Sequence, residues 1–246
     1  MVEVNGQRFP QLIVAAVVLA AALVASALVV TDTWDKQRSS VTVTGAATKE
    51  LRSDWAVWRL NLNRRSPDRA EALAGVKRDL EQVRQFLFGA HGIPEGEVSV
   101  LPLSLNVIYQ VDQFGRETGQ IQAYQANQTV EVKSADVDRI TEAYKSTGEL
   151  VEKGVELYVE PPQYFYTKLD ELKLEMLAQA TENARQRAER IAQKAGGRLG
   201  GLRSAKMGVF QITPVHSTEV SDYGINDTSS LEKKITAVVS VQFNLE

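Results

Sequence analysis

The sequence predicts an α+β protein, in which an N-terminal transmembrane helix is followed by a mixed, mainly antiparallel sheet with helices on one face. Three observations predict this class. Residues 12–30 form an uncharged apolar run, segments with alternating apolar residues recur along the rest of the chain, and three further segments carry apolar residues at helical spacing. About 215 residues follow the apolar run, enough for one large domain or two small ones.

The apolar run, LIVAAVVLAAALVASALVV, has the length of a helix that spans a bilayer. At 1.5 Å per residue it extends about 28 Å, close to the ~30 Å hydrocarbon core of a membrane. The anchor positions are Leu12, Val18, Leu23 and Val30. A cleavable signal is the alternative, because residues 25–27 fit the A-x-A pattern; the run continues beyond them, which favours a retained anchor.

Charge and composition narrow the class of protein. The 246 residues include no cysteine, which excludes disulfides, thiolate nucleophiles, iron–sulfur clusters and a lipid-anchored N-terminal cysteine. The net charge is −3 and no basic stripe occurs, which argues against nucleic acid as a partner. Arg8 precedes the apolar run and Lys36 and Arg38 follow it, so the positive-inside count is nearly balanced.

A short tail before a single hydrophobic segment is typical of a signal anchor that exports the rest of the chain. We therefore predict a tail and anchor at residues 1–31, a linker at 32–40, and an exported domain at 41–246 with a possible subdivision near residue 160. The predicted topology is that of a single-pass membrane protein whose C-terminal domain is exported.

The first predicted elements are strands at residues 41–44 and 55–62, followed by a helix. Ser66, Pro67 and Asp68 supply an N-cap, a proline at the first helical position and an acidic first turn. Two glycines close this helix. Its apolar stripe consists of Leu73, Val76, Leu80, Val83 and Leu87.

A hairpin and a second helix come next. Residues 98–111 and 121–132 are predicted strands flanking a polar tip, and residues 137–151 have helical spacing. A further strand is expected over residues 155–166. Because the prolines at 161–162 cannot donate to a sheet ladder, this strand bends or runs along an edge there.

The third predicted helix, residues 168–195, is the longest and carries a stripe of small residues. That stripe packs flat on a sheet or lies between subunits. Strands at 202–213 and 235–245 finish the chain, and the polar excursion 214–233 is either a floppy hairpin tip or a docking arm for a neighbour. The candidate oligomer contacts are Ala180, Ala184, Ala188, Tyr223 and Ile225.

From the second strand to about residue 160 the element order is βαββαβ, which is a ferredoxin-like arrangement. The third helix and the last two strands either extend this sheet or build a second layer, joined by the first strand. Helices on one face leave the other sheet face open, and strand edges need cover. Pairing with another copy of the chain provides it.

No catalytic, cofactor or metal site is predicted. His91 and His216 lie in separate loops without a metal-ligand spacing, so both are expected to be ordinary surface residues. The glycine-rich residues 196–201 follow a helix and precede a strand, the reverse of a phosphate loop, so a helix C-cap and tight turn are expected. The last candidates are aromatic: Trp55, Trp58 and residues 164–166. They could line a ligand groove, but we favour packing in the core or in a subunit contact.

The assembled order of motifs resembles the SIMPL-domain family of bacterial envelope proteins, over about residues 40–246. Ser53 stands where that family usually has a proline before the aspartate, and the excursion 214–233 is longer than is typical. The matching motifs are VTVTG at 41–45, SDWA at 53–56, YQANQTV at 124–130, DVDRI at 136–140, ARQRA at 184–188, AQKA at 192–195, GRLG at 197–200 and ITAVVSVQF at 235–243.

The resemblance implies an exported protein of the bacterial envelope, located in the inner membrane with its C-terminal domain in the periplasm or extracellular space. Some members are strong antigens or are linked to oxidative stress, and at least some build closed, hollow homo-oligomers. Our leading hypothesis is a membrane-anchored, non-enzymatic scaffold or vestibule that forms a ring- or cage-like homo-oligomer, with the lipid bilayer and other envelope proteins as further partners. The alternative is a soluble periplasmic module, released by signal cleavage, that binds a small apolar ligand or a client peptide. A hydrolase is a third hypothesis, which no motif supports.

Overall fold

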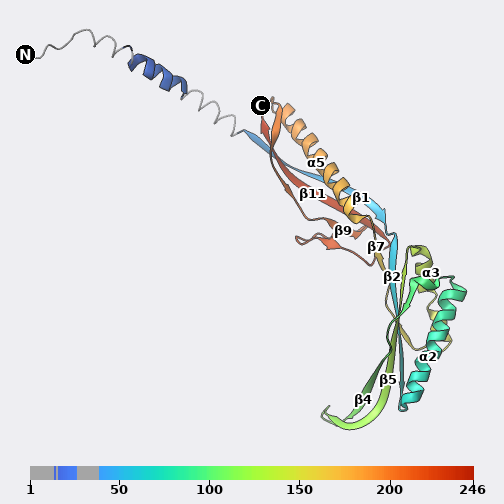
Figure 1. Cartoon of the computed structure of the whole chain (residues 1–246). Coiled ribbons are helices and arrows are strands. Elements are labelled where there is room, and N and C mark those ends of the chain that lie inside the picture. Colours follow the sequence, from blue (N-terminus) through green and yellow to red (C-terminus); the bar gives the residue numbers. More distant parts are fainter. Residues whose placement is uncertain (1–13, 15, 27–38) are drawn as a thin grey trace, which may run out of the picture. The chain divides into compact units, whose positions relative to one another are not determined.

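The computed structural model describes residues 14, 16–26 and 39–246 (Figure 1). Residues 14 and 16–26 are helical, and Val18 and Leu23 are exposed there. The remainder of the predicted anchor, with Leu12 and Val30, lies outside the described residues. Within the described ranges, no helix is both long and apolar enough to cross a membrane. Residues 39–246 have the predicted mixed α+β structure, with mainly antiparallel sheets.

The chain divides into two compact units. Unit 1 comprises the described residues of Met1–Thr48 with Lys173–Phe210 and Thr236–Glu246, and unit 2 comprises Lys49–Leu172 and Gln211–Ile235. The sequence suggested a single subdivision near residue 160. The observed division is interleaved instead, because the chain passes through unit 2 twice.

Unit 2 contains an antiparallel sheet in the order β3-β5-β2-β6, with β4 also paired to β5 and β7 to β2. The two strands that each helical connection joins are thus separated by one other strand, β2 and β3 by β5, and β5 and β6 by β2, which is the order of a split βαβ unit. Its strands are β2 (Trp55–Ser66), β3 (Val98–Val100), β4 (Ser104–Val111), β5 (Glu117–Ser134), β6 (Leu157–Val159) and β7 (Gln163–Phe165).

The helices of unit 2 pack on this sheet and bury its core (Figure 1). Trp58 on β2 and Val76 on α2 are fully buried there, as is Ile140 on α3. Trp58 is therefore a core residue, as the sequence favoured. The helical segments are α2 (Arg69–Arg84), a π-helical turn at Gln85–Ala90, a 3₁₀ turn at Glu95–Glu97, α3 (Val137–Lys145) and α4 (Gly148–Glu152).

The start of α2 differs from the prediction. Asp68, rather than Ser66, is the N-cap, and its carboxylate accepts the backbone N–H of Glu71 at 3.0 Å. The Ser66 hydroxyl accepts from the Asp68 N–H and donates to the Glu71 carboxylate. The prediction was wrong by two residues because both polar groups take part in one capping network.

Prolines interrupt two of the predicted strands. The strand expected over 98–111 is divided into β3 and β4 at Pro102, and the one expected over 155–166 into β6 and β7 at Pro161 and Pro162. Both β6 and β7 pair with β2 alone among the described strands. The predicted edge position of the prolines is therefore confirmed.

The first strand and the terminal strands form a second sheet and do not extend the first one. The third predicted helix packs on this second sheet. The strand order of the sheet is β1-β11-β9-β10, and β8 also pairs with β11. Helix α5 runs alongside β1 and β11 (Figure 1). These elements are β1 (Ser40–Arg52), α5 (Leu169–Lys194), β8 (Leu199–Met207), β9 (Gln211–Pro214), β10 (Ile225–Asn226) and β11 (Glu232–Leu245).

Candidate functional site

The alanine stripe of α5 lies against the chain's own strand β1. Ala180, Ala184 and Ala188 are fully buried within unit 1. A Cβ atom at Gly45 would lie 2.1 Å from the Ala180 carbonyl oxygen and 2.5 Å from the Ala184 nitrogen. Helix α5 therefore packs flat on its own sheet, which was the alternative to a contact between subunits. Because the three alanines are buried in this packing, they are unavailable for a subunit contact.

Side chains of the same helix cover the outer edge of β1. The backbone N–H of Ala46 donates to Asn183 Oδ1 at 3.2 Å, and Arg187 Nη1 donates to the Thr44 carbonyl at 2.8 Å. The Thr44 carbonyl and the Ala46 N–H point to the same edge of the strand, away from β11. The helix thereby occupies backbone groups that would otherwise invite another strand.

The edge of β8 has no such cover in the part of the chain that the structure describes. There β8 pairs with β11 and with no other strand. Most of β8 is exposed, including Leu202 (61%) and Met207 (56%), which lie opposite the buried Phe243 and Val239 of β11. Unit 1 therefore has one protected and one open strand edge.

The hairpin of β4 and β5 extends beyond the other strands of unit 2 as a two-stranded ribbon (Figure 1). Strand β2 ends its pairing with β5 at Tyr124, so residues 117–123 pair with β4 alone among the described strands. We call residues 107–123 the apolar ribbon. Its exposed apolar side chains are Val107, Tyr109, Val111, Phe114 and Ile121.

A compact turn holds the tip of the apolar ribbon. Asp112 accepts the backbone N–H groups of Phe114 and Arg116, and its carboxylate also pairs with the Arg116 guanidinium at 2.9 Å. The hydrogen bond from the Arg116 backbone, with that from Phe114, holds the pKa of Asp112 below its usual value. Arg116 lies over the Phe114 ring, which is 72% exposed. The tip thus presents a large aromatic ring in a fixed position.

The polar excursion between β9 and β11 is held against its own unit and is not a floppy tip. Gln211 Nε2 donates to the Ser221 carbonyl at 2.6 Å, and Lys234 Nζ donates to that of Ser217 at 3.0 Å. Ile225 lies in β10, which pairs in parallel with β9, and is partly buried. Tyr223 is 97% exposed. Of the two predicted contacts on the excursion, Tyr223 is therefore the one presented on the surface.

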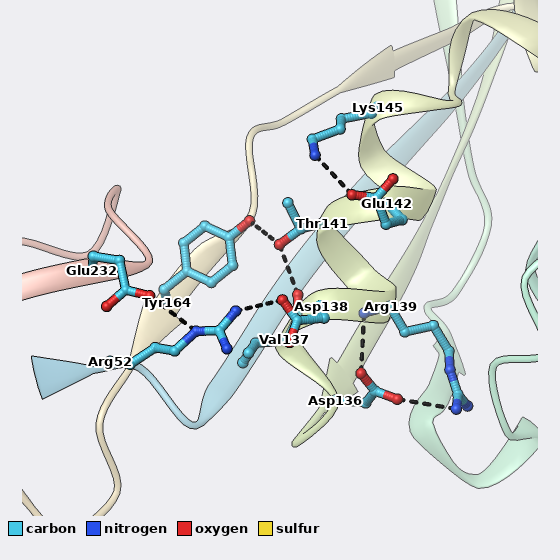
Figure 2. A network of polar contacts seen from close by, with 10 residues as sticks. All are labelled: Arg52, Asp136, Val137, Asp138, Arg139, Thr141, Glu142, Lys145, Tyr164 and Glu232. Atoms are coloured by element: carbon cyan, nitrogen blue, oxygen red, sulfur yellow. Dashed lines mark hydrogen bonds and ion pairs between the residues drawn. The ribbon is translucent and has the colours of Figure 1, made fainter.

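A network of charged and hydroxyl groups surrounds the start of α3 in unit 2 (Figure 2). Arg52 forms ion pairs with Asp138 on α3 and with Glu232 on β11, the latter at 3.0 Å between Nε and Oε1. Tyr164 contacts the Thr141 hydroxyl at 2.8 Å. Because that hydroxyl donates to the Val137 carbonyl, the Tyr164 hydroxyl is the donor in the pair. These contacts fasten four elements to one another, β1, β7, β11 and α3.

Lys233 is a buried cation that sequence reasoning missed. Its Nζ donates to the Tyr164 carbonyl at 2.6 Å and to the Asp227 carbonyl. Burial lowers the pKa of Lys233, and the charge of Asp227 partly opposes this. Burial alone would raise the pKa of Asp227. Hydrogen bonds from Ser229 and Ser230 nevertheless hold the pKa of Asp227 below its usual value. The signal was present in the sequence, because alternation places Lys233 on the same strand face as buried Ile235.

Asp54, in the SDWA step at the start of β2, holds two distant segments of unit 2 together. Its carboxylate accepts both the backbone N–H and the hydroxyl of Thr167, each at 2.7 Å. The Asp54 N–H donates to the Phe165 carbonyl, and the neighbouring Ser53 N–H donates to the Leu231 carbonyl. This aspartate therefore fastens the start of β2 to the segment that follows β7 in unit 2, which is a structural role.

The remaining predicted positions show no reactive arrangement. His91 contacts the Phe86 ring, with centroids 4.4 Å apart, and His216 is exposed. Among the described residues, no group of acidic, histidine or cysteine side chains could hold a metal ion. The Gly196 and Gly197 N–H groups donate to carbonyls of α5, and Gly196 has φ +81°, so the predicted helix C-cap is confirmed.

The comparison with protein families identifies one match. The SIMPL family, described as a protein of unknown function (DUF541), matches residues 41–243. This range is nearly the one over which the sequence motifs resemble that family, and the resemblance is confirmed. The search of curated proteins found no match.

Proposed function

Since this chain belongs to the SIMPL family, we propose that it is a membrane-anchored periplasmic protein that assembles into a ring- or cage-like homo-oligomer. The assembly acts as a non-enzymatic scaffold or vestibule of the bacterial envelope. The observation that carries the proposal is the apolar ribbon. Its side chains face solvent in a single copy, and an isolated two-stranded ribbon is at best marginally stable in water.

Self-assembly would remove this apolar surface from water. Fully burying one large apolar side chain contributes about 1.5–3 kcal/mol, so a few of the ribbon's side chains support a stable contact. A closed symmetric arrangement covers such surfaces without open-ended aggregation. Coverage of strand edges by further copies is consistent with the open edge of β8.

The membrane anchor rests on the uncharged run at residues 12–30. Its described helical residues expose Val14, Val17, Leu19 and Val24, as expected for a surface in contact with lipid. Several anchors on one ring would insert at high effective concentration, so that membrane attachment strengthens with assembly.

The mass of the full-length protein, extracted from membranes in a mild detergent, tests the proposal. We expect a discrete species of many times 27.2 kDa after subtraction of bound detergent. Replacing Val111 and Phe114 with serine should reduce that mass, while Asp112 keeps the tip of the ribbon folded. A wild-type mass near 27.2 kDa would overturn the proposal and favour the soluble binding module.

The binding module has less support. Two hollows lie between β1 and α5 in unit 1, and both are shallow and open. Polar side chains such as Gln179, Glu182 and Gln186 line much of one, whereas the other, beside Val43 and Ile191, is more apolar. Sites for apolar ligands are concave and mainly apolar. The two shallow hollows therefore do not favour the alternative.

A further inference from the structure

Two exposed segments of this chain have opposite charge. From residue 190 to residue 218 the sequence contains no Asp or Glu, while Arg198, Arg203 and Lys206 lie in or beside β8. From residue 207 to residue 232 it contains no Lys or Arg, while Glu219 and Asp222 lie in the loop between β9 and β10. We call β8 with Arg198 the basic edge and residues 215–224 the acidic loop.

We propose that the acidic loop of one copy docks on the basic edge of a second copy. This inference rests on the proposed homo-oligomer and names its subunit contact. Both surfaces are available, because Arg198, Lys206, Glu219 and Asp222 are exposed. Opposite charges on two exposed surfaces steer their encounter and fix their register.

The apolar residues of the two surfaces are also complementary. Leu202 and Met207 continue the buried apolar face of β11 on to β8, beyond the cover of α5. On the acidic loop, Val220 is 82% exposed and Tyr223 protrudes fully. A rigid aromatic side chain of this kind is a frequent anchor of protein interfaces. Tyr223 of the acidic loop would be the anchor, and Leu202 and Met207 of the basic edge would form the apolar surface that receives it.

The backbone favours the same occupant. The outer edge of β8 pairs with no strand within the described chain, whereas α5 protects the edge of β1. An extended segment can add to such an edge through main-chain hydrogen bonds. The acidic loop has no helix of its own and is held at Ser217 and Ser221, so docking orders little additional chain.

The contact joins two different surfaces, so each copy keeps one of each for its neighbours. Such a head-to-tail contact generates a ring when the rotation between copies closes. A contact between two identical basic edges is disfavoured, because like charges would then face each other. The pairing of unlike surfaces therefore suits a ring, in which each copy gives its acidic loop to one neighbour and its basic edge to the other.

Reversal of the charges on full-length protein in mild detergent tests this contact. One variant carries Arg198→Glu and Lys206→Glu, and the other carries Glu219→Lys and Asp222→Lys. We expect each alone to lose at least tenfold in assembly affinity and to fall toward the mass of one copy. Co-expressed in one cell, the two variants should assemble together, since each basic surface then meets an acidic one.

Matched controls separate this contact from changes in net charge or folding. Glu149→Lys with Glu152→Lys makes the same charge change as the acidic-loop variant, but on exposed residues of α4, and should leave the mass unchanged. Tyr223→Ala should weaken assembly without changing any charge. All variants should keep the far-UV circular dichroism spectrum of the wild type.

The outcomes distinguish the two proposals. A wild-type protein that is a single copy overturns both of them. If the wild type assembles and the charge reversals assemble equally well, the proposed contact is wrong while the homo-oligomer stands. Two variants that each dissociate but fail to assemble together would also overturn the contact, because the two surfaces would then not meet each other.

Discussion

Asn183 on α5 accepts the backbone N–H of Ala46 on β1, with 3.2 Å between nitrogen and Oδ1. A side chain of a helix thus occupies a ladder position at the edge of a sheet. Arg187, four residues further along α5, donates in the same way to the carbonyl of Thr44 on β1. Natural proteins protect strand edges in several ways, and in unit 1 the covering helix itself does so.

Replacing Asn183 with alanine should make β1 prone to association. The Ala46 N–H loses its partner, which costs about 0.5–1.5 kcal/mol, and the edge becomes available to other strands. We expect a lower urea midpoint and faster growth of light scattering near that midpoint. Gln179→Ala is the control, because Gln179 donates to Glu175 on the same helix. Equal scattering by both variants would contradict an edge-protecting role.

Gly45→Ala should destabilise unit 1 by overpacking. The added Cβ would overlap the α5 backbone at Ala180 and Ala184, so the helix must move away from β1. Forced displacement in a packed core costs about 1–3 kcal/mol or more. Chemical denaturation of the full chain measures this cost. Gly89→Ala is a matched control, since no described atom lies within 4 Å of a Cβ at Gly89, and a comparable loss there would disprove the packing explanation.

Local patterns predicted most elements of this fold. Alternation at residues 55–62 and the stripe through Val76 and Val83 reflect one buried face each, so they identified β2 and α2. The order of these elements then predicted the ferredoxin-like topology. Prolines 161 and 162 indicated an edge because a missing N–H is a local property.

Long-range partners were not predictable in the same way. Nothing local in the stripe at Ala184 distinguishes a contact with β1 from a contact with another subunit, and only the position of Gly45 decides it. The interleaved units likewise depend on which strands pair. Lys233 was missed because a charged residue on a buried strand face contradicts the usual pattern until its two carbonyl acceptors are known.

Asp79→Ala should be much more destabilising than Glu156→Ala, although both remove a partner of Arg64. Asp79 is 1% exposed and pairs with Arg64 through both oxygens, at 2.6 and 2.9 Å. Loss of Asp79 removes two charge-assisted hydrogen bonds of Arg64, each worth about 1.5–3 kcal/mol, and leaves only Glu156 and the Gly154 carbonyl as partners. Glu156 is largely exposed, and its loss should cost less than about 1 kcal/mol. Free energies of unfolding from urea titrations decide the matter, and similar values for the two variants would refute it.

Lys233 should add a pH dependence to stability in the alkaline range. Burial lowers its pKa in the folded protein, whereas an unfolded lysine titrates at about pH 10.4. Between these two values the unfolded state binds more protons, so stability rises with pH, by less than about 1.4 kcal/mol per pH unit for one proton. This gain in stability is lost again as the pH falls through the lowered pKa of Lys233 in the folded protein.

The variant Lys233→Met should remove this rise. Unfolding of the wild type, Lys233→Met and Lys234→Met is compared at several pH values from 7 to 10. Lys234 serves as the control because it lies on the opposite strand face and donates to the Ser217 carbonyl. If the stability of Lys233→Met relative to the wild type does not fall with rising pH, burial of this cation does not govern the effect.

Val18→Asp should release the protein from membranes. Val18 lies in the middle of the uncharged run 12–30, and an aspartate at the centre of a spanning helix costs about 2.5–3.5 kcal/mol on the insertion scale. The membrane-bound fraction after carbonate washing should therefore fall several-fold, while Val18→Leu behaves like the wild type. Sequencing the N-terminus of membrane-extracted protein provides a second measurement. An intact N-terminus is expected, and a mature chain that begins near residue 28 would show that the segment is a cleaved signal.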